Sequence, residues 1–157
     1  MPRLIVLDTF PLSSVAKREP MHGAAPTLLD RCQEWVKECI RAGNRVIAPA
    51  ITYYETLREL ERLNATSQIA RLRAFCIATP ERYLPLQDAD LNLAAKLWAQ
   101  SRNNGLPTSS PEALDGDVIL VAQVLSIQTD LEIVIATTNV GHLSQFVAAE
   151  LWSDIAP

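Results

Sequence analysis

The chain has 157 residues, of which 48% are hydrophobic and 20% charged, and it carries a formal net charge of −4. This length suits one domain with an ordinary buried core, and the composition excludes extended disorder. The acidic balance argues against nonspecific adhesion to nucleic acid through a broad basic field, although it does not exclude a nucleic-acid substrate.

The first predicted element is a buried strand near the N-terminus. Residues 4–7, LIVL, are apolar without alternation, which favours a central parallel strand covered on both faces. Asp8 follows directly, at the carboxyl end of this strand, where open α/β sheets build ligand sites. Three prolines within residues 10–26 predict an irregular connection or a short helix there.

Helical and strand patterns then alternate along the chain. Helical periodicity covers 27–41, a short strand follows over 45–48, and Pro49 opens another helix. The remaining predicted elements up to residue 111 are a helix over 67–78, a strand over 82–86, a helix over 88–104 and a polar loop over 106–111. A helix capped by Ser110, with Pro111 and Glu112 in its first turn, then reaches about Ile127. It is followed by a strand over 132–137, a turn over 139–141 and a short helix from about Leu143. This alternation predicts an α/β fold, a three-layer α/β/α sandwich with a mainly parallel central sheet.

Polar side chains follow the predicted strands or lie in the helices beside them. Asp8 ends the first strand, Glu55 lies one or two turns into the helix after the second, and Asn139 follows the last. Asp115 and Asp117 open the long helix before that last strand. Because parallel strands end at one edge of a sheet, we expect these groups to converge there. Such oxygen donors suit a hard divalent cation, which activates water and neutralises phosphoryl charge during phosphodiester hydrolysis.

Each of these residues also has an ordinary structural interpretation. An aspartate after a strand is often a helix N-cap, and a glutamate on a helix is usually a surface charge. Asp115 and Asp117 are two positions apart, so on a helix they point about 160° to 200° apart and cannot both address one ion without irregular backbone. Periodicity alone does not choose between them, and the other can serve as a first-turn carboxylate.

Basic and sulfur-containing side chains give weaker signals. Two interpretations of the arginines stay open, a local phosphate-binding patch or a solvated helix surface paired with neighbouring glutamates. These arginines are Arg58, Arg62, Arg71 and Arg73. The three cysteines have no CxxC spacing, so we expect small core residues. Because no apolar run reaches the roughly 18 residues of a membrane span and no signal-peptide pattern is present, we expect a cytoplasmic protein.

Four segments together resemble a known family. LIVLDT at 4–9, PAITYYETLREL at 49–60, LDGDVILVAQ at 114–123 and IATTNVGHL at 135–143 resemble the PIN-domain family, and most closely its bacterial VapC-like toxins. The resemblance covers almost the whole chain in the right order. It implies a single PIN-like domain over 1–157.

The resemblance also implies roles for particular residues. Asp8, Glu55 and Asp117 correspond to the catalytic, metal-binding acids of the family. The implied metal positions are these three acids together with Asp115, as a supporting or alternate ligand, and Asn139, and the implied substrate-binding residues are Thr9, Arg58 and Arg62. Asn139 is neutral, which leaves three firm acids. His142 can be a cap, a surface residue or a base, and Phe10 is bulkier than we expect at its position.

Members of this family resemble Mg²⁺- or Mn²⁺-dependent ribonucleases, and the VapC-like ones are toxins held inactive by a small antitoxin protein. The implied partners are therefore an RNA substrate, an antitoxin and, because homodimers are common in the family, a second copy of the chain. Two rivals remain. A haloacid dehalogenase-type phosphatase needs a second aspartate where Phe10 stands, whereas a noncatalytic PIN-fold module that binds RNA or protein is compatible with the neutral Asn139.

Overall fold

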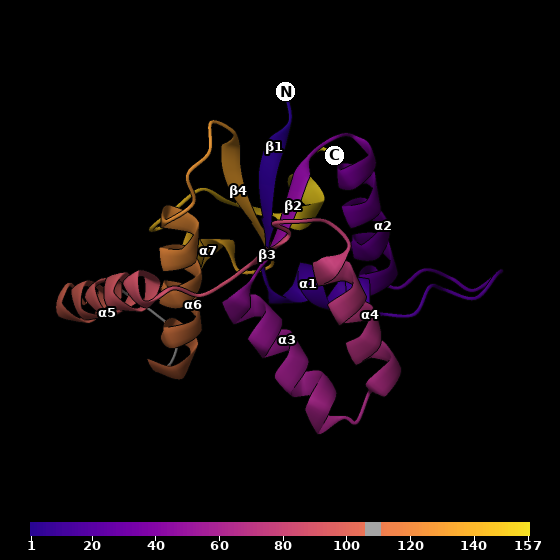
Figure 1. Ribbon diagram of the computed structural model, residues 1–157, viewed down its shortest axis with the longest axis horizontal. Helices are drawn as coiled ribbons and strands as arrows, with labels where there is room; N and C mark the ends of the chain where they lie inside the picture. Colours follow the sequence, from indigo (N-terminus) through magenta and orange to yellow (C-terminus); the bar gives the residue numbers. More distant parts are fainter. Residues whose placement is uncertain (106–110) are drawn as a thin grey trace.

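A central sheet of five parallel strands organises the computed structural model, which describes residues 1–105 and 111–157 (Figure 1). The strands are β1 (Arg3–Leu7), β2 (Arg45–Pro49), β3 (Tyr83–Leu84), β4 (Glu132–Thr137) and β5 (Ala149–Leu151). Their order across the sheet is β3-β2-β1-β4-β5, and every neighbouring pair is parallel. The first predicted strand is therefore the central one.

Helices cover both faces of this sheet (Figure 1). Within the described residues they are α1 (Thr9–Ala16), α2 (Leu28–Arg41), α3 (Ala50–Arg62), α4 (Thr66–Ile77), α5 (Asp88–Asn103), α6 (Pro111–Leu125) and α7 (Val140–Leu143), followed by a 3-10 turn at Trp152–Asp154. On β1, Ile5 and Leu7 pack with α1, α2 and α4, whereas Leu4 and Val6 pack with α6 and α7. The strand is buried on both faces, and the predicted three-layer sandwich is confirmed.

The strand order creates a crevice at one edge of the sheet. From β1 the chain proceeds to β2 and β3 on one side, then returns to pair β4 with the other side of β1. Ligands in open α/β sheets bind beyond the carboxyl ends of the strands where the order reverses in this way. Asp8 follows β1 and Asn139 follows β4, so both lie at this switch point.

Several predicted boundaries differ from the structure. Residues 9–16 form helix α1, with Pro11 in the first turn, where its missing N–H costs no hydrogen bond. The short helix predicted from Leu143 is wrong, because α7 ends at that residue. The chain then forms β5, whose three residues are too few to show a strand pattern. The predicted cap at Ser110 and the predicted polar loop over 106–111, except for its last residue, lie outside the described residues. That last residue, Pro111, begins α6.

Buried Gln123 of α6 ties three elements together. Its Oε1 accepts a hydrogen bond from the N–H of Ile51 at 3.1 Å, in the first turn of α3, which has no other side-chain cap. Its Nε2 donates to the carbonyls of Leu84 and Pro85 at 3.1 and 3.2 Å. Because α3 and α6 both carry acids of the predicted site, this side chain fixes their relative positions.

We expect Gln123→Leu to lower the free energy of unfolding by about 2 kcal/mol, because one donor and two acceptors in part-buried hydrogen bonds lose their partner. Urea unfolding followed by circular dichroism measures the loss. Gln100→Leu, on the exposed surface of α5, is the matched control and should change stability by less than about 0.5 kcal/mol. Equal effects of the two substitutions would contradict the role assigned to Gln123.

The three cysteines are core residues, as predicted. All are buried and unpaired, and burial raises the pKa of Cys32 to about 12 and those of Cys39 and Cys76 to about 11. Their thiols are therefore protonated at neutral pH and unreactive. Across the described helices, none is both long and apolar enough to span a membrane.

Candidate active site

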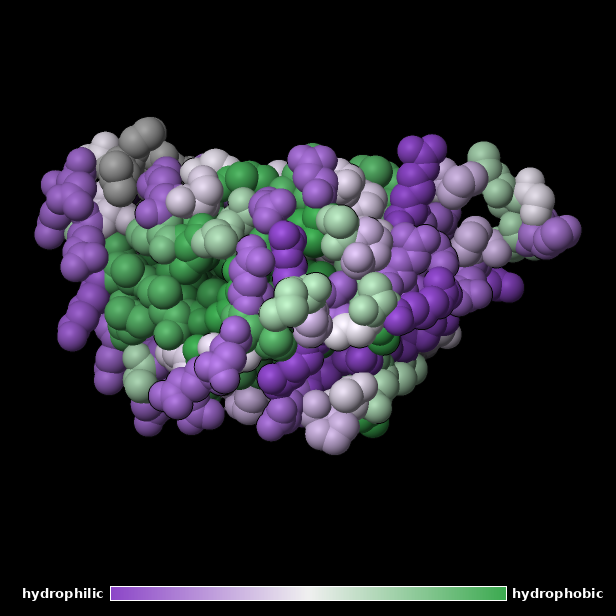
Figure 2. Space-filling view, turned by 90° about the horizontal axis from the view of Figure 1, so that it is seen from above, coloured by the Kyte–Doolittle hydropathy of each residue, from purple (hydrophilic) through white to green (hydrophobic). Residues whose placement is uncertain are grey.

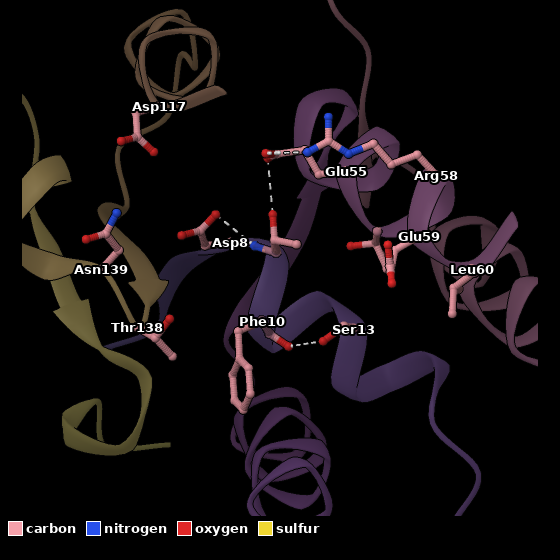
Figure 3. Close-up of a pocket in the computed structure, with 12 residues that line it drawn as sticks. Asp8, Phe10, Ser13, Glu55, Arg58, Glu59, Leu60, Asp117, Thr138 and Asn139 are labelled. Carbon is pink, nitrogen blue, oxygen red and sulfur yellow. Dashed lines mark hydrogen bonds and ion pairs between the residues drawn. The ribbon is translucent and has the colours of Figure 1, made fainter. Parts of the chain in front are cut away.

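A cavity of about 700 Å³ opens beyond the carboxyl end of β1 (Figure 3). Asp8, Glu55, Asp117 and Asn139 all line it. They come from the β1–α1 junction, α3, α6 and the connection between β4 and α7, which are separate in sequence. The structure thus brings together four of the predicted site residues at the switch point of the sheet.

Asp8 is held at the floor of this cavity by two hydrogen-bond donors, one backbone N–H and one hydroxyl. Its Oδ1 accepts from the N–H of Thr9 at 2.8 Å, which makes Asp8 the N-cap of α1. Its Oδ2 accepts from the hydroxyl of Thr137 at 2.6 Å. The N-cap and ligand interpretations are therefore compatible, since the cap fixes the carboxylate beside the cavity.

Thr137, at the end of β4, is a site residue that the sequence analysis missed. It is fully buried, and its hydroxyl also accepts from the N–H of Asn139 at 2.8 Å. The one signal in the sequence was a hydroxyl residue closing the last strand before the predicted fourth ligand position. Thr137 links two residues that line the cavity, Asp8 and Asn139.

Burial raises the pKa of Asp8, and the hydrogen bonds from Thr137 and Thr9 oppose that rise. We therefore expect Thr137→Val to raise the pKa of Asp8 further, because the isosteric valine removes a donor that favours the carboxylate. Carbon-detected NMR titration of the metal-free protein measures this change. Exposed Thr138→Val serves as the control, and an unchanged Asp8 pKa in Thr137→Val would contradict the assignment.

Glu55 faces the same cavity from α3. Its Oε1 accepts from the Thr9 hydroxyl at 3.1 Å, and its Oε2 lies 3.9 Å from a guanidinium nitrogen of Arg58. Burial raises the pKa of Glu55, the Thr9 hydrogen bond opposes this, and the negative charge of Asp8 raises it again. The predicted small hydroxyl neighbour, Thr9, thus donates its hydroxyl to Glu55 and its backbone N–H to the N-cap Asp8.

Asp117 completes the acidic wall from α6. Burial and the charge of Asp8 raise its pKa, and His142 lowers it. The Nδ1 of His142 lies 3.4 Å from Asp117 Oδ2 and 2.9 Å from Asn139 Nδ2. The structure thus places the His142 ring against one acid and one amide that line the cavity.

Two predicted site residues are not brought into this cavity. Asp115 is exposed and lines a separate, apolar groove between α5 and α6, because residues two apart on a helix face opposite ways. Arg62 pairs with Glu59 on the surface of α3 and does not line the cavity. Arg58 does line it, with its guanidinium also over the ring of Tyr54.

Arg71 and Phe10 have structural explanations. Arg71 donates to the carbonyl of Ala16 at 2.8 Å and so joins α4 to α1. Phe10 lines one side of the cavity, but its ring stacks on Trp152 with centroids 6.5 Å apart. Figure 3 shows this ring pointing away from the acids. Its bulk anchors the start of α1 to the C-terminal segment.

The donor set suits a hard divalent cation. All its members carry oxygen ligands, and the mutual charge of the acids creates a negative potential in the cavity. Over residues 1–105 and 111–157, no group of three or more His, Cys, Asp or Glu side chains is close enough together to hold a metal ion by itself. Mg²⁺ needs no such cage, because it keeps several waters and binds through one or two carboxylates together with substrate phosphate.

Sequence comparison finds no relatives, whereas structure comparison finds several. No protein-family model and no curated protein matches the chain. A chain of FitAB bound to an IR36 DNA fragment aligns with a TM-score of 0.67 and 18% identity, covering 98% of both chains. VapBC-1 from nontypeable Haemophilus influenzae gives 0.62 and 17%, and FitAcB from Neisseria gonorrhoeae gives 0.60 and 21%, each over 96% of this chain and 99% of the other.

These neighbours define the class of fold. The chain has the α/β fold of a PIN domain, as its motifs predicted. More narrowly, the aligned structures are toxin–antitoxin PIN-domain proteins of the VapC and FitB kind. At 17 to 21% identity the likeness establishes the fold, and function must be argued from the site itself.

Proposed function

We propose that the chain is a divalent-metal-dependent endoribonuclease that hydrolyses RNA phosphodiester bonds, and that it acts as the toxin of a type II toxin–antitoxin pair. The observation that carries this proposal is the convergence of Asp8, Glu55 and Asp117 on one cavity at the switch point of the sheet. Carboxylates with raised pKa values in a shared cleft are typical of functional sites.

Asp8, Glu55 and Asp117 would hold Mg²⁺ or Mn²⁺, with Asn139 as a neutral fourth donor that can reach a water or a phosphate. When bound, the ion supplies a water of lowered pKa and neutralises charge on the phosphoryl group. Thr9 and Thr137 hold the carboxylates in place. These two hydroxyls thereby limit the rotamer freedom that metal binding would otherwise have to restrict.

Arg58 is the side chain we assign to phosphate guidance. It lines the cavity, is exposed, and forms only a long ion pair with Glu55, at 3.9 Å. A guanidinium in that position can pair with two phosphate oxygens at once. Arg62 does not line the cavity and its guanidinium is paired with Glu59, so it is assigned no contact with the scissile phosphate.

Cleavage of a labelled single-stranded RNA by the purified chain tests the proposal. We expect cleavage in Mg²⁺ or Mn²⁺ and none after chelation with EDTA. Cleavage that continues unchanged in EDTA would contradict a metal-dependent mechanism. Absence of both cleavage and metal binding would instead favour the noncatalytic binding module, which the neutral Asn139 permits.

The structural neighbours support the proposed protein partner. FitAB and VapBC-1 are complexes named for two components, so we propose a small antitoxin for this chain as well. A short open reading frame immediately upstream is the place to find it, and its product should suppress both RNA cleavage and any growth arrest on induction. If this product neither binds the chain nor suppresses its RNA cleavage, the proposed pairing would be contradicted.

We further propose that the chain is a homodimer. Figure 2 shows a broad apolar surface at the end of the molecule that carries α5 and α6. A groove of about 390 Å³ in this region is lined by Leu91, Trp98 and Ile119 among others. Apolar surface of this kind marks contact sites. Light scattering should give twice the 17.3 kDa mass of one chain, and a monomer at micromolar concentration would contradict the proposal.

A further inference from the structure

We infer that Gly116 of α6 is a positioning residue that fixes the carboxylate of Glu55 in the acidic cavity. The inference rests on the proposed function, because it assigns Glu55 to the metal-binding set. It concerns a residue that contributes no ligand atom. Its effect is steric, and it acts across the gap between α6 and α3.

The evidence is the space that a side chain at Gly116 would occupy. A Cβ built on this residue would lie 3.0 Å from Glu55 Oε2 and 3.5 Å from Glu55 Cδ. The three nearest atoms to that Cβ all belong to the Glu55 carboxylate. The carboxylate therefore rests against the backbone of α6, in space that exists because residue 116 has no side chain.

Backbone conformation does not explain the glycine. Gly116 lies inside α6, between Pro111 and Leu125, and its φ is not in the left-handed region. Within a helix glycine is less favourable than alanine, because it loses more conformational freedom on folding. The helix itself would therefore gain from alanine, and the contact with Glu55 is the feature that alanine would disturb.

The displacement caused by alanine would fall on Glu55 and not on the fold. The clashing atoms are the end of a flexible side chain, so they can move without any shift of backbone. On its other oxygen, however, Glu55 accepts the hydrogen bond from Thr9 at 3.1 Å. Oε2 must move away from α6 by a few tenths of an ångström, and this movement lengthens that bond. Gly116 thus leaves room for Oε2, while Thr9 donates a hydrogen bond to Oε1.

Gly116→Ala tests this inference, with Gly141→Ala as the matched control. Gly141 is also in a helix near the cavity, but a Cβ there meets nothing within 4 Å. We expect Gly116→Ala to weaken Mn²⁺ binding about tenfold, a typical cost of disturbing the groups around a ligand. Its thermal stability should be unchanged or raised. Gly141→Ala should bind Mn²⁺ like the wild type.

A double-mutant cycle separates positioning from a general packing role. Glu55→Asp shortens the carboxylate by one methylene and withdraws it from α6. In that background, we expect Gly116→Ala to cause no further loss of Mn²⁺ affinity, because the clash is gone. A purely structural role for Gly116 predicts the same loss in both backgrounds, and that additive result would overturn the inference.

A crystal structure of Gly116→Ala makes the inference independent of catalysis. The distance between Thr9 Oγ1 and Glu55 Oε1 should exceed its present 3.1 Å. If the wild type binds Mn²⁺ and Gly116→Ala binds it equally well, the inference fails while the proposed function stands. If the wild type binds no Mn²⁺, the proposed function fails. An undisplaced Glu55 in the crystal structure of Gly116→Ala would then overturn the inference as well.

Discussion

Asp8→Asn is expected to lower metal-dependent RNA cleavage by about 10³-fold, because it removes the carboxylate that we propose as a metal ligand of the cavity. The same change should not destabilise the metal-free protein. Burial raises the pKa of Asp8, so its ionisation disfavours the folded state once the pH exceeds the unfolded pKa. Asparagine removes that penalty and remains a good N-cap for α1.

Two measurements decide the Asp8→Asn result. Cleavage is followed with a labelled RNA in Mn²⁺, and thermal unfolding is followed in EDTA. Asp130→Asn, on an exposed bend, controls for the loss of one negative charge and should retain wild-type cleavage. Full activity in Asp8→Asn would remove this carboxylate from the mechanism, and a large fall in melting temperature would make the lost cleavage uninformative about chemistry.

Asp117→Asn and Asp115→Asn form the second comparison, and we expect opposite results from them. Asp117 lines the acidic cavity and its pKa responds to the charge of Asp8. Its neutralisation should lower RNA cleavage by about 10²-fold or more. Asp115 lines the separate groove beside α5 and is exposed. Its neutralisation should leave cleavage within about twofold of wild type, because surface substitutions away from a site have small effects.

The pair is matched in charge, chemistry and position on α6, so it tests the orientation of the helix. Rates are measured at several Mn²⁺ concentrations, and the Asp117→Asn loss should be partly recovered at high Mn²⁺. Comparable losses in both variants would show that α6 presents both acids to substrate. A loss confined to Asp115→Asn would place the site on the other side of the helix.

Most of the fold could be predicted from local patterns. The uninterrupted LIVL run predicted a strand buried on both faces, and the structure puts β1 in the middle of the sheet. The order of the strands could not be predicted, because pairing depends on contacts between residues far apart in sequence. Short elements were also missed. The three residues of β5 and the four of α7 are held by tertiary contacts and not by their own periodicity.

The candidate site was predictable in its acids and not in their supports. Strand ends and helix starts indicated Asp8, Glu55 and the pair Asp115 and Asp117, since parallel strands deliver their carboxyl ends to one edge, and the family resemblance then selected Asp117. A hydroxyl residue at the end of the last strand was the one signal for Thr137, but it did not indicate that Thr137 reaches Asp8 across 129 positions, or that Gly116 abuts Glu55. Such contacts depend on the distance between packed elements, which no single segment encodes.

The choice between Asp115 and Asp117 also depends on tertiary packing that the local sequence does not specify. Helical spacing established that the two acids face apart, but the direction of α6 relative to the sheet decides which one meets Asp8. Val118 and Leu114 are buried against α5, and this packing turns Asp117 toward the cavity. Periodicity gave the angle between the residues, and tertiary packing gave the direction.

Isothermal titration of Mn²⁺ into the purified, EDTA-treated chain and into Asp8→Asn tests the central claim most directly, because it asks whether this acidic cavity is a metal site. We predict saturable binding to the wild type that is weakened at least about 10²-fold in Asp8→Asn. Circular dichroism should show that both proteins are folded. No binding to the wild type, or equal binding to both proteins, would contradict the assignment of this cavity as the metal centre of a ribonuclease.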